Sequence, residues 1–254
     1  MVADGVPFAF ERHWARIARD AAELHVPIPR DSEVVRRKLV ELVEANGAFN
    51  STLRIAIVRN GGGMWAAPSI GRECDVIALT ADSKDWGNGV KLGSQTQARH
   101  AACQFAGTKI LSWAMNLTWL ENAQRRGFDE VVLLNERGEV AECTSANIFV
   151  ANGREVATPP LNSGCLPGIT REVLLGEIHV PGVSIVERRL LLDDLFAADE
   201  VFITSTTRNL LPVARIEDRQ VGRTNEVQLA LTAAFSAFVK KYVAEHRELS
   251  QAHR

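Results

Sequence analysis

The sequence predicts a mixed α+β fold. Apolar residues recur at helical spacing in some stretches and alternate with polar residues in others. Glycine, asparagine and proline separate these stretches, as is typical of turns. With 254 residues, the chain is long enough for one large domain or two modest ones. We find no internal repeat and no low-complexity segment.

The first part of the chain has the pattern of a small α/β unit. Apolar residues follow a helical period twice, and prolines separate the two stretches. Ser32 precedes the second stretch and is expected to cap its helix. We expect helices over residues 8–24 and 32–44, strands over 53–58 and 75–79, and a turn at glycines 61–63.

The rest of the chain is predicted to mix strands and helices in one larger unit. Residues 86–107 are less patterned and rich in Gly, Ser, Thr and Gln, so we interpret the end of this stretch as an interdomain connection. After it we expect helices over 110–126, 170–178, 193–196 and 225–248, and strands over 131–134, 140–142, 147–150, 183–188 and 201–204.

Charge and cysteine content exclude several classes of protein. The formal net charge is −2, which gives no electrostatic reason to expect nucleic acid or an anionic membrane as a partner. No segment has the pattern of a signal peptide or a transmembrane span. The four cysteines are scattered without a Cys-x-x-Cys pair, so we expect neither a metal site nor a disulfide framework. These features favour a cytoplasmic protein.

Four short segments carry residues suited to one cofactor. They are Gly-Thr-Lys ending at Lys109, Glu-Cys-Thr-Ser-Ala-Asn from Glu142, Leu-Pro-Gly-Ile-Thr-Arg over 166–171, and Thr-Ser-Thr-Thr over 204–207. No one of them is specific alone. Their order and spacing together favour a site for pyridoxal 5′-phosphate (PLP), which needs an amine, a carboxylate and an anion site. The chain is therefore predicted to be an enzyme of amino-group chemistry.

Lys109 is the candidate for the amine. It lies between Gly107 and the apolar pair Ile110-Leu111, a setting that could partly desolvate the amine and lower its pKa. Judged alone, a surface lysine at the start of a helix is the better interpretation.

Glu142 is the candidate for the carboxylate. It ends an apolar strand and is followed by small polar residues. A glutamate that points inward there would need a cation, and a pyridinium would serve. An outward strand residue in a hairpin is an equally good interpretation of Glu142 alone.

The phosphate would need N–H groups, hydroxyls and a guanidinium. Ile169 and Thr170 begin a predicted helix, and Ser205 and Thr206 end a predicted strand. Arg16 could supply the guanidinium. Ordinary helix capping, a capped turn and a solvated helix arginine are the simpler explanations of these residues taken one by one.

Together, the four segments resemble the class IV, or fold-type IV, PLP-dependent aminotransferases. This family includes branched-chain amino acid aminotransferases, D-amino acid transaminases and aminodeoxychorismate lyases. The resemblance runs from about Pro7 to Gly222 and is most specific over residues 142–170. It implies a small α/β domain, a larger domain with a barrel-like β core, and a homodimer. We expect the small domain over residues 1–97, a linker over 98–106 and the large PLP-binding domain over 107–254.

The resemblance also implies roles for individual residues. Lys109 matches the Schiff-base lysine and Glu142 the partner of the pyridine nitrogen. Arg16 falls on the phosphate arginine. The two phosphate-binding turns correspond to Ile169 with Thr170 and to Ser205 with Thr206, and in relatives Thr206 and Thr207 lie where the substrate carboxylate docks.

Two features depart from the family pattern. Relatives usually carry an N-terminal segment like Asp-x-Gly-x-x-Tyr-Gly-Asp-Gly-x-Phe-Glu that helps to line the substrate pocket, and Met1 stands about where that segment would already have ended. Many relatives also place a tyrosine shortly after the lysine, near O3′ of the cofactor. Trp113 stands near that position here, and indole can donate only through its Nε1–H.

The predicted reaction is transfer of an amino group from an amino acid to a 2-oxo acid by way of Lys109. The resemblance favours a branched-chain or similar apolar amino acid. Aminodeoxychorismate lyase and D-amino acid transaminase are the alternatives of the same fold. A catalytically impaired, PLP-fold binding or structural dimer is the alternative of another class.

Overall fold

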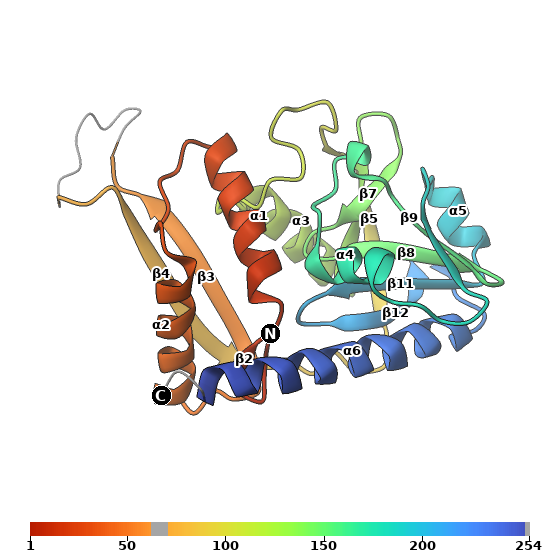
Figure 1. The fold of residues 1–254 in the computed structure, drawn as a ribbon. Helices are drawn as coiled ribbons and strands as arrows, with labels where there is room; N and C mark the ends of the chain where they lie inside the picture. Colours follow the sequence, from red (N-terminus) through yellow and green to blue (C-terminus); the bar gives the residue numbers. More distant parts are fainter. Residues whose placement is uncertain (62–70, 252–254) are drawn as a thin grey trace. The chain divides into compact units, whose positions relative to one another are not determined.

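A computed structural model describes residues 1–61 and 71–251, with side chains described through residue 247 (Figure 1). The chain forms two compact units. The first unit contains Met1–Lys84 and Val239–Arg254, and the second contains Asp85–Phe238. The turn expected at glycines 61–63 lies mostly outside the described residues.

The first unit is built on a four-stranded antiparallel sheet with the strand order β2-β1-β3-β4. β3 and β4 pair along their whole length, and the predicted strands at 53–58 and 75–79 lie within them. The short pair β1 and β2 was not predicted. The four strands are β1 (Val2–Ala3), β2 (Val6–Pro7), β3 (Ser51–Arg59) and β4 (Cys74–Asp82).

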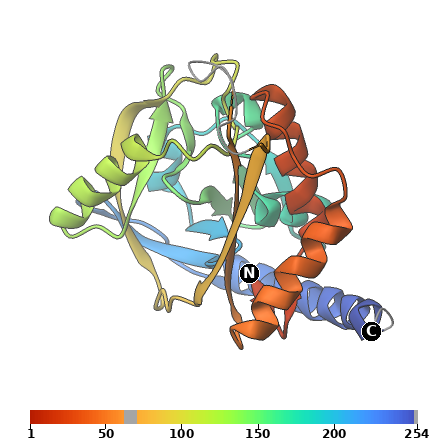
Figure 2. The same cartoon turned by 90° about the vertical axis from the view of Figure 1, so that its left-hand side faces the viewer.

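Two helices, α1 (Phe10–Glu23) and α2 (Ser32–Ala45), pack against this sheet (Figures 1 and 2). Their apolar faces contribute Phe10, Val35 and Leu39 to a core that also holds Leu53 and Ile55 of β3. Both helices were predicted. The expected N-cap of α2 was wrong by one residue, because Asp31 accepts the N–H groups of Glu33 and Val34. A carboxylate at this position also faces the positive end of the helix dipole.

The second unit is built on a nine-stranded mixed sheet with the order β10-β9-β8-β11-β12-β5-β6-β7, to which β13 adds by pairing with β12. β5 runs parallel to both of its neighbours, and β9 and β10 are also parallel. The strands are β5 (Val90–Arg99), β6 (Glu130–Asn135), β7 (Val140–Cys143), β8 (Asn147–Asn152), β9 (Glu155–Thr158), β10 (Ser184–Glu187), β11 (Glu200–Ser205), β12 (Asn209–Ile216) and β13 (Arg219–Gln220).

This sheet curls into a half-barrel. In Figure 1, β5 and β7 run across the direction of β8 and β11. Buried aliphatic residues from seven strands meet in one core, with Leu92, Val132, Ile148 and Ile203 among them. The predicted α+β fold with a barrel-like β core is confirmed.

Helices flank the strands of the second unit. They are α3 (Ala114–Arg125), the short 3-10 helix η1 (Leu161–Ser163), α4 (Ile169–Gly176) and α5 (Leu192–Ala197). A long helix, α6 (Glu226–Gln251), begins in the second unit and ends in the first. In the first unit its Tyr242 packs edge-on to Phe8, with 5.2 Å between the ring centroids, and donates a hydrogen bond to Glu11 at 2.7 Å.

The structure adds to or corrects the expectations for residues 86–126 at two places. The stretch without a clear pattern contains β5, a strand that was not predicted because its small and polar residues do not alternate with apolar ones. The helix expected to begin at residue 110 begins at Ala114. The predicted domain boundaries at 97 and 107 describe the two domains of the family and stay a prediction.

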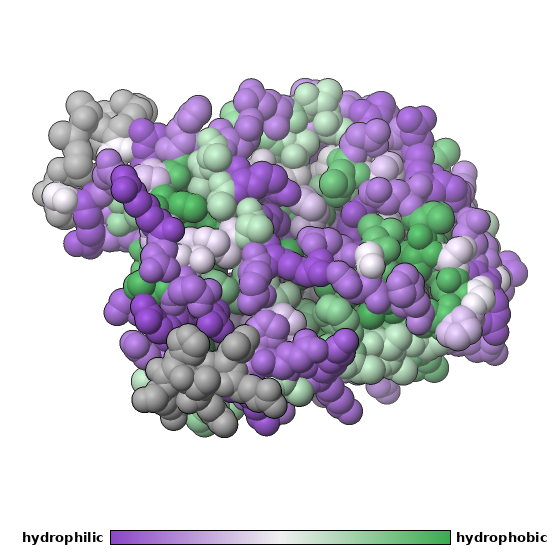
Figure 3. Space-filling view, viewed as in Figure 1, coloured by the Kyte–Doolittle hydropathy of each residue, from purple (hydrophilic) through white to green (hydrophobic). Residues whose placement is uncertain are grey.

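The described helices do not include one that is long and apolar enough to cross a membrane. Hydrophilic residues cover much of the face seen in Figure 3, and hydrophobic residues form smaller areas between them.

Candidate active site

Glu142 lies on β7 as a buried carboxylate with two N–H donors. Arg99 Nε donates to Oε1 at 2.9 Å, and the backbone N–H of Leu166 donates to Oε2 at 3.0 Å. Burial raises the pKa of Glu142, and the charges of Arg99 and Lys109 and the Leu166 N–H oppose this rise. The sequence-based hypothesis of an inward-facing glutamate is therefore the correct one of the two alternatives.

The cation beside Glu142 was missed. The sequence pattern indicated that an inward glutamate would need a positive partner, and a pyridinium was the partner considered. The chain itself provides Arg99 from the end of β5, with side chains only 18% and 11% exposed for Arg99 and Glu142. Because β5 had no strand pattern, nothing in the sequence placed Arg99 beside Glu142.

Lys109 lies in an irregular segment before α3. It is close enough to Glu142 to lower the pKa of that carboxyl, and its Nζ lies 6.0 Å from the centroid of the Trp113 ring. In the single chain Lys109, Ile110 and Leu111 are all exposed. The desolvating apolar setting expected from the sequence is therefore absent within one chain.

The segment that carries Lys109 touches the loop before α4. Gly107 has a φ of +75°, and a Cβ at this position would lie 2.9 Å from the carbonyl oxygen of Cys165. Only glycine adopts this conformation without strain and allows so close an approach. The contact places the lysine segment next to the Leu-Pro-Gly-Ile-Thr loop.

Asn147 at the start of β8 organises that loop. Its Nδ2 donates to the carbonyl oxygen of Leu166 at 2.8 Å, and its Oδ1 occupies the space that a Cβ on Gly168 would need. The backbone N–H of Leu166 also donates to Glu142. The loop is therefore hydrogen-bonded both to the end of β7 and to the start of β8. Asn147 belongs to the Glu-Cys-Thr-Ser-Ala-Asn segment quoted above, but its contact with the loop could not be predicted.

The loop ends at the N-terminus of α4, where Gly168 is the N-cap residue. Ile169 and Thr170 are 2% and 1% exposed, and Thr170 Oγ1 has no hydrogen-bond partner among the described residues. A buried hydroxyl without a partner is rare in folded proteins and costs free energy. Together with the N–H groups of a first helical turn, it forms a place that suits an anion.

The hydroxyl-rich end of β11 lies beside the same loop. Thr204 of β11 is paired with Asn147 of β8. The turn over residues 205–207, which follows Thr204, therefore begins beside the residue that holds the loop. Ser205 Oγ and Thr207 Oγ1 lie 3.3 Å apart, and buried Thr204 Oγ1 has no hydrogen-bond partner in the described part of the chain. The structure thus brings Lys109, Glu142, Ile169, Thr170, Ser205 and Thr206 into one region of the second unit.

Arg16 belongs to the first unit. It is half-buried on α1, in the helix predicted for that part of the chain. Its role toward a phosphate stays a prediction from the sequence.

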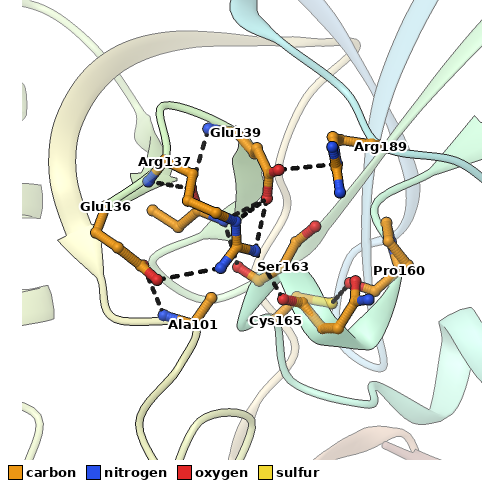
Figure 4. A network of polar contacts seen from close by, with 10 residues as sticks. Ala101, Glu136, Arg137, Glu139, Pro160, Ser163, Cys165 and Arg189 are labelled. Carbon is orange, nitrogen blue, oxygen red and sulfur yellow. Dashed lines mark hydrogen bonds and ion pairs between the residues drawn. The ribbon is translucent and has the colours of Figure 1, made fainter.

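A second polar network joins the segments that precede Lys109 and the Leu-Pro-Gly-Ile-Thr loop (Figure 4). Arg137 lies between Glu136 and Glu139 and also donates to the carbonyl oxygen of Asn162 at 2.9 Å. Glu136 accepts the backbone N–H of Ala101 at 2.8 Å. The network therefore connects Ala101, which precedes the lysine segment, with η1, which precedes the Leu-Pro-Gly-Ile-Thr loop.

Residues 1–216 match the family of amino-transferase class IV, which covers more than half of the chain. The chain belongs to this family. Transamination with PLP is the reaction of class IV aminotransferases, so the protein is a PLP-dependent enzyme of fold type IV.

The relatives of this class IV aminotransferase agree with the assignment. A D-alanine aminotransferase of Bacillus licheniformis is 30% identical over 240 residues, which cover 91% of this chain and 83% of the relative. A branched-chain-amino-acid aminotransferase of Salmonella typhimurium is 26% identical over 246 residues, which cover 91% of this chain and 79% of the relative. A branched-chain aminotransferase of Thermoproteus uzoniensis, solved with norvaline, superposes with a TM-score of 0.82 at 25% identity, over 93% of this chain and 82% of the other.

The residues present fit PLP. Two buried threonine hydroxyls in this region have no partner among the described residues, and one of them, that of Thr170, stands at a helix N-terminus. A carboxylate of raised pKa and a lysine lie within electrostatic reach of each other. In the described part of the chain, no group of three or more His, Cys, Asp or Glu side chains could hold a metal ion.

Proposed function

We propose that Lys109, Glu142, Ile169, Thr170, Ser205 and Thr206 hold PLP, and the role of Arg16 toward its phosphate stays a prediction from the family resemblance. The observation that carries this proposal is the position of Glu142. Its buried carboxylate interacts with Lys109 and is linked through Leu166 to the loop that ends at the buried hydroxyl of Thr170. An amine, an acid and an anion site in this order match the aldehyde, ring nitrogen and phosphate of the cofactor.

When bound, PLP supplies an electron-withdrawing ring that stabilises negative charge at the α-carbon of an amino acid. We assign Lys109 Nζ two tasks: it binds the cofactor, and once released it takes the α-proton of the substrate and returns it on the cofactor side. We assign Glu142 the task of holding a proton on the ring nitrogen. Arg99 and the Leu166 N–H keep the carboxylate oriented for this task.

The proposed substrates are an amino acid of the branched-chain or similar apolar type and a 2-oxo acid. The branched-chain aminotransferases that are similar to this chain in sequence and in fold support this choice. The Thr206-Thr207 pair is proposed to receive the substrate carboxylate, as the family resemblance implies. A cytoplasmic location stays a prediction from the sequence.

A D-amino acid donor is the second candidate. The observation in its favour is the D-alanine aminotransferase that is 30% identical over 91% of this chain. Both candidates use the same cofactor site, and they differ only in which face of the α-carbon is turned toward Lys109.

We also propose a homodimer. Exposed apolar side chains gather on the segment around Lys109, where Phe105, Leu111 and Met115 are 46%, 66% and 66% exposed. In the first unit, Ile77 and Leu79 of β4 are also about half exposed, on the sheet face opposite the one that α1 and α2 cover. Exposed apolar surface of this kind is typical of a protein interface. Light scattering on the eluting protein is expected to give twice the mass of the chain.

The cofactor assignment is tested by trapping. The protein incubated with PLP is expected to show the visible absorbance band of a lysine-bound cofactor, and borohydride reduction is expected to fix the adduct on the peptide that contains Lys109. Lys109→Ala should lose both signals. Lys241→Ala, which removes an exposed lysine of α6, is the matched control and should keep them. An adduct on another lysine, or no band in the wild-type protein, would contradict the assignment.

The substrate assignment is tested with a panel of donors. L- and D-forms of valine, leucine and alanine are offered with 2-oxoglutarate, and the loss of the visible band reports the first half-reaction. Turnover of the L-branched-chain donors supports the first candidate, and turnover of D-alanine alone supports the second. Release of pyruvate from aminodeoxychorismate without amino transfer would identify a lyase. Binding of PLP without any half-reaction would indicate the non-catalytic alternative.

A further inference from the structure

Arg208 follows directly after the hydroxyl-rich turn, and its guanidinium is buried. Its side chain is only 5% exposed and pairs with Glu130, with Nη2 and Oε2 at 3.0 Å. Its Nη1 donates to the backbone oxygen of Ser145 at 3.0 Å and to Oγ of Ser145 at 2.8 Å. The arginine therefore connects the β11–β12 turn to the β7–β8 connection, which begins two residues after Glu142.

Trp86 covers the outer face of this guanidinium. The Cζ atom of Arg208 lies 4.0 Å from the centroid of the Trp86 ring, a close cation–π contact. The indole Nε1–H donates to the backbone oxygen of Thr207 at 3.2 Å. Trp86 thus contacts the arginine with its ring and the turn itself with its edge.

Glu130 extends the connection to the other side. Its Oε2 accepts Ser145 Oγ at 2.6 Å, and its Oε1 accepts the hydroxyl of Thr144. The backbone oxygen of Thr144 accepts Asn116 Nδ2 at 2.7 Å.

The same chain of contacts reaches Glu142. Arg99 Nη1 donates to Asn116 Oδ1 at 3.2 Å, and Arg99 Nε donates to Glu142. An unbroken series of polar contacts therefore runs from the carboxylate assigned to the ring nitrogen to the turn that carries Thr206 and Thr207.

The arginine is not placed to bind a ligand itself. Glu130 neutralises its charge, and Trp86 covers its face. A buried ion pair also adds little to stability compared with apolar side chains of the same volume. The planar guanidinium of Arg208 offers N–H donors in fixed directions to several acceptors at once. An apolar side chain at this position would not.

We propose that Arg208 and Trp86 are positioning residues that hold the Ser205–Thr207 turn at a fixed place relative to Glu142. The inference rests on the proposed function, since this turn is assigned to the phosphate and to the substrate carboxylate. A turn that is free to shift weakens both contacts, because each depends on N–H and hydroxyl groups held in place before the ligand arrives. Lys109 and Glu142 are untouched, so the chemical step is retained.

Two variants test this pair. Trp86→Phe keeps an aromatic ring over the guanidinium and removes the indole hydrogen bond to Thr207. Arg208→Lys keeps the positive charge and removes the planar guanidinium with its several N–H donors. Each is expected to raise the dissociation constant of PLP and the KM of the amino donor by about tenfold, the factor that one hydrogen bond typically carries. The kcat at saturation should change less than about threefold, because the lost interaction is used for binding.

Matched controls separate this effect from general destabilisation. Arg215→Lys makes the same change on β12, where the guanidinium lies over Phe128, 5.2 Å from its centroid. Trp119→Phe makes the same change on α3, where the side chain packs on a separate apolar cluster. Both controls should keep wild-type affinity for PLP and donor. Urea unfolding of each apoprotein reports the stability change.

The outcomes are distinguishable. If wild-type protein binds PLP and transfers amino groups while Trp86→Phe and Arg208→Lys match their controls in affinity and KM, the positioning role is wrong and the proposed function stands. If both variants lose kcat and keep KM, the positioning role is likewise wrong. If the wild-type protein forms no adduct on Lys109, the proposed function itself fails.

Discussion

Arg99 Nε donates a hydrogen bond to Glu142 Oε1 at 2.9 Å, and both side chains are largely buried. The carboxylate therefore has a cation of its own before any cofactor binds. This pair comes from strands that are not neighbours in the sequence, β5 and β7, which β6 joins in the sheet. Burial raises the pKa of Glu142, and the charge of Arg99 opposes that rise while its Nε–H orients the carboxyl group.

Removal of that cation is expected to destabilise the apoprotein in a pH-dependent way. Arg99→Met leaves the Glu142 carboxylate buried without its ion-pair partner, which typically costs about 3 kcal/mol of unfolding free energy. The folded-state pKa of Glu142, already raised by burial, should rise further, so stability is lost as the pH rises through it. Urea unfolding should show a larger loss at pH 8 than at pH 5.

Arg36→Met is the control for this experiment, because Arg36 makes an ion pair with Glu33 on the surface of α2. Such a pair contributes less than about 1 kcal/mol. An equal loss for Arg99→Met at both pH values would show that the ion pair with Glu142 is not the cause.

Loss of the charge at Glu142 is expected to slow the reaction. Glu142→Gln keeps the shape of the side chain and its contact with Leu166, and it removes the negative charge that holds a proton on the ring nitrogen. We expect kcat to fall by roughly 10²–10³-fold, as for the loss of one preorganised electrostatic group. The adduct with Lys109 should still form.

Glu200→Gln is the matched control for Glu142→Gln. Glu200 is also a buried glutamate on a strand, and its carboxylate accepts the N–H groups of Val227 and Gln228 at the start of α6. Its replacement should lower stability and leave kcat within about threefold of the wild type, since only electrostatic groups aimed at the reacting atoms change the barrier. Steady-state kinetics on both variants checks the contrast.

The cysteines are expected to differ in reactivity toward a thiol reagent at pH 8. Burial raises the pKa of Cys165 to about 12, and burial also raises the pKa of Cys143 well above its ordinary value. Cys103 is exposed. Because the thiolate is the reacting form, Cys103 should react first, and Cys143 and Cys165 only after unfolding in urea. Cys103→Ser should remove the fast phase, and a fast phase that remains would contradict the prediction.

Gly107 is expected to tolerate no side chain. Gly107→Ala introduces both a left-handed alanine and a contact 2.9 Å from the Cys165 oxygen. Gly127→Ala introduces only the left-handed alanine, because φ is +82° and no atom lies within 4 Å of the added Cβ. The left-handed conformation alone costs about 1–2 kcal/mol. Gly107→Ala should cost more than Gly127→Ala in urea unfolding and should also reduce trapping of PLP on Lys109. Equal effects would show that the contact with Cys165 is not tight.

Local sequence patterns predicted the elements whose side chains alternate or follow a helical period. The helices α1 and α2 and the strand β3 were predicted for this reason, whereas β6 and β8 were predicted from short apolar runs that turn residues separate. β5 was missed because its small and polar residues form neither an alternating pattern nor an apolar run. The start of α3 was misplaced because Ile110 and Leu111 are apolar but exposed, so their spacing did not mark a buried helix face.

The sequence by itself determined the family, the fold and the list of residue types that the cofactor needs, because short motifs in a fixed order carry that information along the chain. Only the tertiary structure decided that Glu142 points inward, that Arg99 neutralises it and that Thr170 keeps a buried hydroxyl without a partner in the described residues. It also brought Arg208, Trp86 and Glu130 together, although they lie far apart in the sequence. Such contacts depend on which strands become neighbours in the sheet, and no local pattern in the chain records that pairing.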